Sequence, residues 1–90
     1  MSVRSFRVTG RVQGVGFRAF VVRLAASVGV AGAVRNDADG AVTGFAEGDR
    51  ESLEQFRRGL ERGPAYARVE RVEEAEIASP PERGDFDVSF

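Results

Sequence analysis

A four-residue turn at residues 37–40, with the sequence Asp-Ala-Asp-Gly, constrains the fold of this chain more than any other feature. The segments on either side, residues 30–36 and 41–47, have the length and composition of strands. Gly40 supplies the positive φ that a tight hairpin usually needs. Because a hairpin reverses the chain, the two strands must run antiparallel. The sequence therefore excludes a continuous parallel sheet at this point.

The segments around this hairpin predict a strand and two helices. Apolar and polar side chains alternate from residue 3 to residue 12, which is typical of a half-buried strand. From Phe17 the apolar residues follow a helical spacing, and Gly29 is a natural end for that helix. Asp49 is a suitable N-cap for a second helix, which ends at Gly63.

The C-terminal part predicts two further strands. One lies within residues 68–77, where Val69 and Val72 differ in parity, so we expect a bulge or a late start. Residues 86–90 alternate as a short last strand. The order is β-α-β-β-α-β with a terminal strand. We therefore expect residues 1–90 to form one α+β domain, the ferredoxin-like split βαβ arrangement, with two helices on one face of an antiparallel sheet.

The composition excludes several kinds of chemistry. The chain has no Cys and no His, so disulfides, thiolate metal sites and an imidazole base are ruled out. No apolar run approaches the roughly 18 residues of a membrane span, and the N-terminus lacks the apolar region of a signal peptide. These features predict a cytoplasmic protein without a membrane partner. A net charge of −1 argues against a nucleic-acid binder.

The charges are unevenly distributed along the chain. Residues 1–36 carry six Arg and no acid, whereas residues 37–90 carry seven Arg and fourteen acids. The basic half either attracts an anion or pairs with the acidic half across the fold. The sequence leaves both interpretations open.

The junction between the first strand and the first helix predicts an anion site. Gly14 and Gly16 allow successive backbone N–H groups to converge at the helix start, where the helix dipole adds positive charge. Arg18 adds a planar, permanently charged group. A Walker A loop is excluded because the chain has no Lys. The spacing Gly14-x-Gly16-x-x-Ala19 also fits a dinucleotide fingerprint, but the hairpin leaves no room for the further βα units of that fold.

The same loop, together with later segments, resembles the signature of the small acylphosphatases. The resemblance spans nearly the whole chain in order. The matching segments are Gly10-x-Val12-Gln13-Gly14-Val15-Gly16-Phe17-Arg18, Gly32-x-Val34-Arg35-Asn36, Asp39-Gly40-x-Val42, Glu47-Gly48-Asp49, Gly63-Pro64, Ala67-Arg68-Val69 and Gly84-x-Phe86-x-Val88.

The resemblance implies a hydrolase that cleaves an acyl phosphate into a carboxylate and inorganic phosphate. It also implies a monomer that needs no cofactor and no metal. Arg18 would be the catalytic, phosphate-binding arginine, and Asn36 would orient the attacking water. The loop residues expected to hold the phosphate are Gly14, Val15, Gly16, Phe17 and Arg18. An acyl phosphate has a good leaving group, so such an enzyme has little need of a strong base.

Some residues depart from the family pattern or allow a second interpretation. Ala33 stands where the family often has a large aromatic residue, and Ser89 where a basic residue is common; we expect changes at the rim of the site and at the C-terminal edge. By spacing alone, Asn36 is typical of a residue that starts a turn. Arg35 is expected to be a surface charge on the opposite face. Phe45 is expected to be partly exposed.

Three alternatives stay open. Glu73, Glu74 and Glu76 suggest either a metal site or a solvated edge. The domain could be a non-catalytic anion-binding or RNA-binding module, although the first strand offers no aromatic residue on its outer face. It could also be a regulatory part of a larger protein. A chain that starts with Met and ends on a strand favours a free-standing enzyme.

Overall fold

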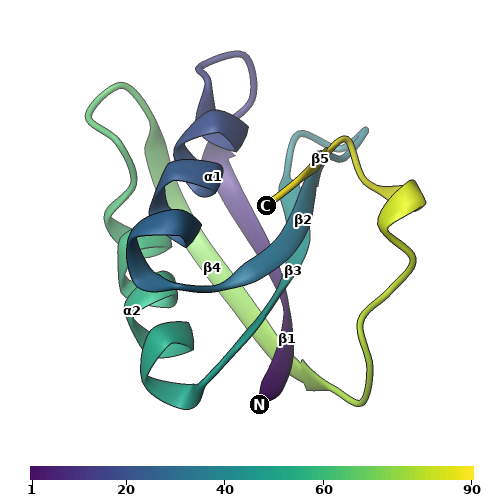
Figure 1. The fold of residues 1–90 in the computed structure, drawn as a ribbon. Helices are drawn as coiled ribbons and strands as arrows, with labels where there is room; N and C mark the ends of the chain where they lie inside the picture. The colour runs from purple at the N-terminus through teal and green to yellow at the C-terminus, as the bar shows by residue number, and fades with distance from the viewer.

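The computed structural model describes all 90 residues as one antiparallel sheet covered on one face by two helices (Figure 1). The elements are β1 (Ser2–Arg11), α1 (Phe17–Val28), β2 (Ala31–Asn36), β3 (Val42–Gly48), α2 (Arg50–Arg62), β4 (Arg68–Ile77), a short 3-10 turn (Arg83–Asp85) and β5 (Val88–Ser89). The strand order in the sheet is β4-β1-β3-β2-β5. This arrangement confirms the predicted ferredoxin-like fold with its extra C-terminal strand.

The hairpin between β2 and β3 forms as predicted. Asn36 at the end of β2 is the partner of Val42 at the start of β3, and the two strands are antiparallel. β3 also pairs with β1, so β1 and β2 lie on either side of it and run parallel to each other. Helix α1 makes the crossover between them (Figure 1). The turn before α1 and the hairpin after β2 therefore meet at the same end of the sheet.

The predicted irregularity in β4 is a β-bulge. The pairing with β1 moves from Thr9–Arg71 to Gly10–Val69, which leaves Glu70 without a partner. This extra residue explains why Val69 and Val72 differ in parity. Gly10 has a φ of 125°, and a Cβ there would lie 2.1 Å from the Arg68 carbonyl oxygen. The sheet therefore requires glycine opposite the bulge.

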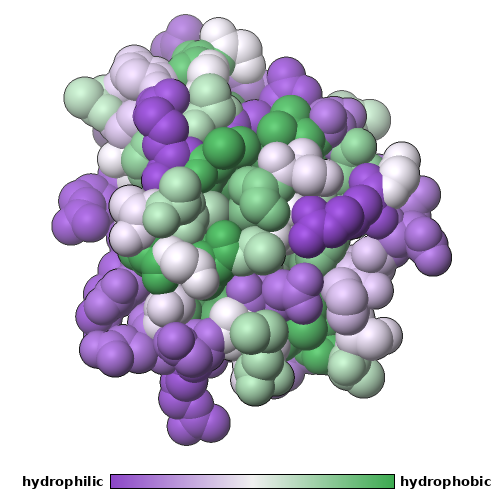
Figure 2. Space-filling model, viewed as in Figure 1, coloured by the Kyte–Doolittle hydropathy of each residue, from purple (hydrophilic) through white to green (hydrophobic).

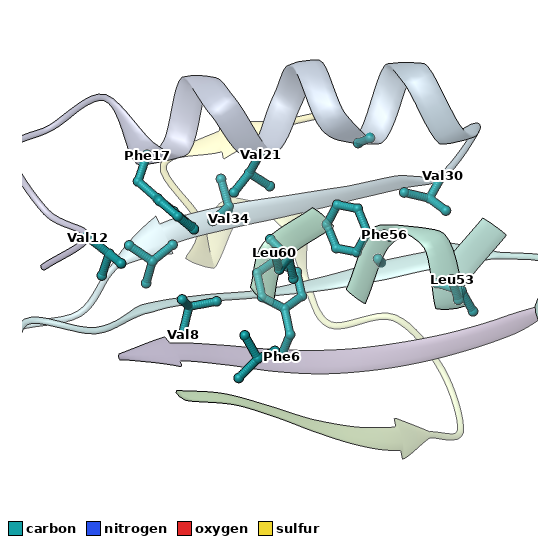
Figure 3. Close-up of a cluster of buried hydrophobic side chains, with 14 residues drawn as sticks. Phe6, Val8, Val12, Phe17, Val21, Val30, Val34, Leu53, Phe56 and Leu60 are labelled. Carbon is teal, nitrogen blue, oxygen red and sulfur yellow. The ribbon is translucent and has the colours of Figure 1, made fainter. Parts of the chain in front are cut away.

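The core lies between the helices and the inner face of the sheet. Phe6 of β1 packs edge-to-face on Phe56 of α2, with ring centroids 5.4 Å apart. Figure 3 shows Phe17 and Val21 of α1 pointing toward Val34 of β2 in the same layer. Burial of these side chains is the main source of stability for a domain of this size. This core gives the loop at the start of α1 a rigid base.

The outer face of the sheet is covered where we expected exposure. The prediction that Phe45 is partly exposed is wrong, because its side chain is fully buried. The Phe86 ring packs edge-on against Phe45 at 5.4 Å, and the Arg83 guanidinium lies 5.4 Å from the Phe45 ring centroid. Arg35 lies 5.3 Å from the Phe86 ring centroid and donates to the Asp85 carbonyl oxygen, so it holds this C-terminal segment as well as carrying a surface charge.

The two departures from the family pattern lie opposite each other. Ala33 of β2 is the strand partner of Ser89 of β5. Ala33 is fully buried, and neither residue lines the main pocket described below. The two departures therefore concern one residue pair between β2 and β5 and leave the lining of this pocket unchanged.

Candidate active site

The loop between β1 and α1 has the backbone conformation that a converging set of N–H groups needs. Gly14 and Gly16 both have left-handed φ values, 73° and 76°. Gly16 is the N-cap of α1, makes no side-chain cap bond, and is followed by a first turn without acidic residues. An α-helix leaves its first N–H groups without intrahelical partners. Here no side chain of the cap or of the first turn supplies an acceptor, which leaves the N-terminus of α1 suited to an anion.

Arg18 is the second residue of α1 and is held by an acid from the far end of the chain. Its Nη1 donates to Oδ2 of Asp87 at 2.9 Å. The same Asp87 oxygen accepts a hydrogen bond from the backbone N–H of Asn36 at 3.0 Å. Asp87 is itself anchored, since its N–H donates to the Val34 carbonyl oxygen. One carboxylate oxygen therefore links Arg18 to the end of β2.

The side chain of Asn36 does not build the adjacent turn. The hairpin is closed by the N–H of Gly40, which donates to the Asp37 carbonyl oxygen, and by the N–H of Ala41, which donates to Oδ1 of Asp39 at 3.0 Å. The side-chain amide of Asn36 makes no hydrogen bond within the protein, although its backbone N–H donates to Asp87. The turn-starting interpretation of its side chain is therefore wrong, and the amide is available to a ligand.

These groups line one pocket of about 610 Å³. Its lining residues come from the loop, the first half of α1 and the ends of β2 and β5: Val12, Gly14, Gly16, Phe17, Arg18, Ala19, Val22, Arg23, Asn36 and Val88. Figure 2, viewed as in Figure 1, shows apolar side chains over the middle of the visible face of the molecule and hydrophilic ones around its margin. All predicted site residues except Val15 line the pocket; Val15 packs against the core instead.

Two residues at the site have roles that the sequence did not reveal. Nε2 of Gln13 donates to the carbonyl oxygens of Asp37, at 2.6 Å, and Ala41, at 2.9 Å, which ties the loop to the hairpin. Gln13 stood within the motif, but only the fold shows what it contacts. Asp87 gave no signal, because it lies 69 residues from Arg18 in the chain.

Glutamates of β4 form ion pairs with arginine side chains. Glu74 pairs with Arg4 and Arg57, while Glu73 and Glu76 also face arginine side chains. No group of three or more potential metal-binding side chains occurs in the structure. Hydrogen bonding to Glu54 raises the pKa of Arg4 above its ordinary value. Much of the basic first half therefore pairs with the acidic second half across the fold.

The fold and the pocket together define a class: a ferredoxin-like domain with a pocket at its first strand-to-helix turn. The family model described as Acylphosphatase matches residues 4–88. The chain therefore belongs to the acylphosphatase family. Members of this family are hydrolases that act on acyl phosphates. Neither helix combines the length and apolar character that crossing a membrane requires.

Individual relatives agree with this assignment. An acylphosphatase of Koribacter versatilis is 51% identical over 77 residues, which cover 86% of this chain and 69% of the relative. An acylphosphatase of Pasteurella multocida is 44% identical over 90 residues and the full length of both chains. The crystal structure of acylphosphatase from Bacillus subtilis superimposes with a TM-score of 0.83 at 38% identity, covering 88% of each chain.

Proposed function

We propose that this chain hydrolyses an acyl phosphate with the backbone of residues 14–18 and Arg18 as the phosphate site and Asn36 as the group that orients water. The observation that carries the proposal is the link through Asp87. One oxygen of this carboxylate contacts both Arg18 and the backbone of Asn36, and both residues line one pocket. The phosphate site and the water site are thereby held at a fixed separation.

The phosphate would be stabilised by charge and by N–H groups. Arg18 uses only Nη1 for Asp87, so its other guanidinium N–H groups can donate to phosphate oxygens. The uncapped N–H groups at the start of α1 add donors and the positive end of the helix dipole. Preorganised donors of this kind stabilise the charge that develops on the equatorial oxygens in phosphoryl transfer. These groups supply positive charge to the phosphate without a cofactor or metal.

The water would be positioned by the free amide of Asn36. Its oxygen can accept a hydrogen bond from water, and its NH₂ can donate one. Attack of this water on phosphorus breaks the P–O bond to the acyl group. The electron pair of that bond leaves with the carboxylate, while the water proton passes to a phosphate oxygen or to solvent. Asn36 has no titratable role in this scheme, so its contribution is orientation.

The non-catalytic RNA-binding alternative is weakened by the outer face of the sheet. RNA-binding modules of this fold stack bases on aromatic side chains of the central strands. The aromatic residue of β3 on that face, Phe45, is fully buried beneath Phe86 and Arg83. This covering, together with the net charge of −1, supports a small-molecule partner over a nucleic acid. A monomeric enzyme of the cytoplasm is part of the same proposal.

Hydrolysis of benzoyl phosphate in EDTA tests this function. Asn36→Ala should lower kcat by about 100-fold to 1,000-fold while leaving competitive inhibition by inorganic phosphate unchanged. Arg18→Ala should lose both turnover and phosphate inhibition. Loss of wild-type activity in EDTA would contradict the metal-free mechanism, and near-native turnover by Asn36→Ala would remove the role given to Asn36.

A further inference from the structure

The main pocket extends beyond the phosphate loop along α1. Its volume of about 610 Å³ falls in the range of sites that hold whole small molecules, roughly 300–1,000 Å³, so there is space for an acyl group next to the phosphate. The wall on this side is formed by Ala19, Val22 and Arg23. These residues have the i, i+3, i+4 spacing that places side chains on one helix face. Two are apolar and the third is a cation.

Arg23 carries a charge that no acid of the protein neutralises. Arg18 pairs with Asp87, and Arg4 and Arg7 each pair with several acids, whereas Arg23 forms no ion pair. Its side chain is exposed, and it is the one arginine besides Arg18 that lines the pocket. No carboxylate is among the lining residues. An anion that enters this part of the pocket would thus meet an available guanidinium group.

Tyr66 places the end of Arg23 close to the phosphate loop. Nη2 of Arg23 donates to the Tyr66 hydroxyl at 3.4 Å. That hydroxyl and the tyrosine ring lie 3.9 and 4.0 Å from the position that a Cβ on Gly16 would occupy. Helical side chains lean toward the N-terminus of their helix, which brings the Arg23 guanidinium in the same direction. Tyr66 is 54% exposed, so it can also face a ligand.

We propose that Arg23 and Tyr66 form a second anion-binding point, which favours acyl phosphates whose acyl group carries a distal carboxylate or another negative charge. The inference rests on the proposed function, because it assumes that Arg18 and the loop hold the phosphate. Arg23 lies five positions after Arg18 in the helix, a rise of about 7.5 Å. The carbon skeleton of the acyl group would then lie on Ala19 and Val22. The Tyr66 hydroxyl accepts from Arg23 and can donate its own proton to the anion.

The test compares benzoyl phosphate with 3- and 4-carboxybenzoyl phosphate, whose rings are the same and whose distal carboxylates differ in position. In Arg23→Gln, kcat/KM for the better carboxylated substrate should fall about tenfold, mainly through KM, because the lost contact is remote from the reacting bond. The value for benzoyl phosphate should stay within about twofold of the wild type, which also shows that the variant is folded. Tyr66→Phe should lower kcat/KM for the same carboxylated substrate about threefold.

Arg58→Gln is the matched control, because Arg58 is exposed on α2, forms no ion pair and does not line the pocket. This variant also removes one arginine charge, and it should leave kcat/KM unchanged for all three substrates. Differences in intrinsic reactivity cancel when kcat/KM for each carboxylated substrate is divided by kcat/KM for benzoyl phosphate in the same protein. An unchanged ratio in Arg23→Gln, or an equal fall for all substrates, would overturn the second anion point while the hydrolase activity stands. A wild type that hydrolyses none of the three would contradict the proposed function itself.

Discussion

The two helices of this domain begin in opposite ways. At α2, the carboxylate of Asp49 accepts the backbone N–H of Ser52 at 2.8 Å, and Glu51 lies in the first turn. At α1, the cap is Gly16 in a left-handed conformation, without a side-chain bond and without an acid in the first turn. Both helices cover the same face of the sheet (Figure 1). Fold requirements alone therefore do not explain why only one of them is capped.

The difference separates a helix start that a side chain caps from a helix start that no side chain caps, as the proposed phosphate site requires. An N-cap satisfies the orphan N–H groups of a helix and stabilises it. The start of α1 is held by groups outside the helix instead, since Gln13 ties the loop to the hairpin and Asp87 holds Arg18. This leaves its N–H groups for an anion, and such a ligand would itself contribute to stability when bound.

Among the variants that test this comparison, giving α1 the charge pattern of α2 should have the largest effect. Ala19→Glu adds an acid to the first turn of α1, next to Arg18 and four residues before Arg23. The new carboxylate interacts favourably with the helix dipole, so Tm should not fall. Because the same carboxylate repels phosphate, the inhibition constant of inorganic phosphate should rise about tenfold. Inhibition kinetics and thermal unfolding measure the two effects. Ala19→Gln is the neutral control, and equal phosphate inhibition in both variants would contradict the open start of α1.

Removing the hydrogen bonds that hold the loop to the hairpin should have a smaller effect than the added charge, and this effect should fall mainly on turnover. Gln13→Ala removes both hydrogen bonds to the hairpin, which loosens the loop relative to Asn36. We expect kcat to fall about fivefold, with a lesser change in phosphate inhibition, because misplacement affects attack by water more than binding. Gln55→Ala provides the comparison, since Gln55 is exposed on α2. A kcat as high as that of Gln55→Ala would show that Gln13 does not position the loop.

Removing the cap of α2 should leave the kinetics unchanged. Asp49→Ala should lower Tm by about 5 °C at neutral pH, with kcat/KM as in the wild type. The Ser52 N–H holds the pKa of the Asp49 carboxyl below its ordinary value. The stabilisation is therefore complete above the unfolded pKa of about 4 and is lost as the pH falls through the lower folded pKa. The Tm values of the wild type and of Asp49→Ala should converge as the pH is lowered from 7 to 2. A difference in Tm that stays constant over this range would exclude the charged cap.

The sequence predicted those parts of the molecule that depend on local signals. Gly29 ends α1 in a left-handed conformation, and Asp49 caps α2, as their residue types indicated. The parity change between Val69 and Val72 predicted the bulge. Glycines before a helix and an arginine at its start likewise indicated where the main pocket lies; its binding of an anion stays a prediction. In each case neighbouring residues carry the information.

The parts that could not be predicted depend on contacts between distant segments. The burial of Phe45 requires the C-terminal segment to cross the outer face, which alternation in β3 cannot reveal. Asp87 meets Arg18 only because β5 pairs with β2. The side-chain amide of Asn36 is free because Asp37 and Asp39 close the turn, and the spacing of these residues in the sequence does not reveal which of them does so. Its role in orienting water stays a prediction.

The most direct test of the phosphate site is a titration with inorganic phosphate followed by the backbone ¹⁵N–¹H signals of the wild-type protein. We expect saturable shifts at residues 14–19 and at Asn36, with a single dissociation constant. The signals of Arg50, Glu51 and Ser52 at the start of α2 should not move. Shifts of equal size at both helix starts, or no saturable shift at the start of α1, would contradict the assignment of this loop as the phosphate site.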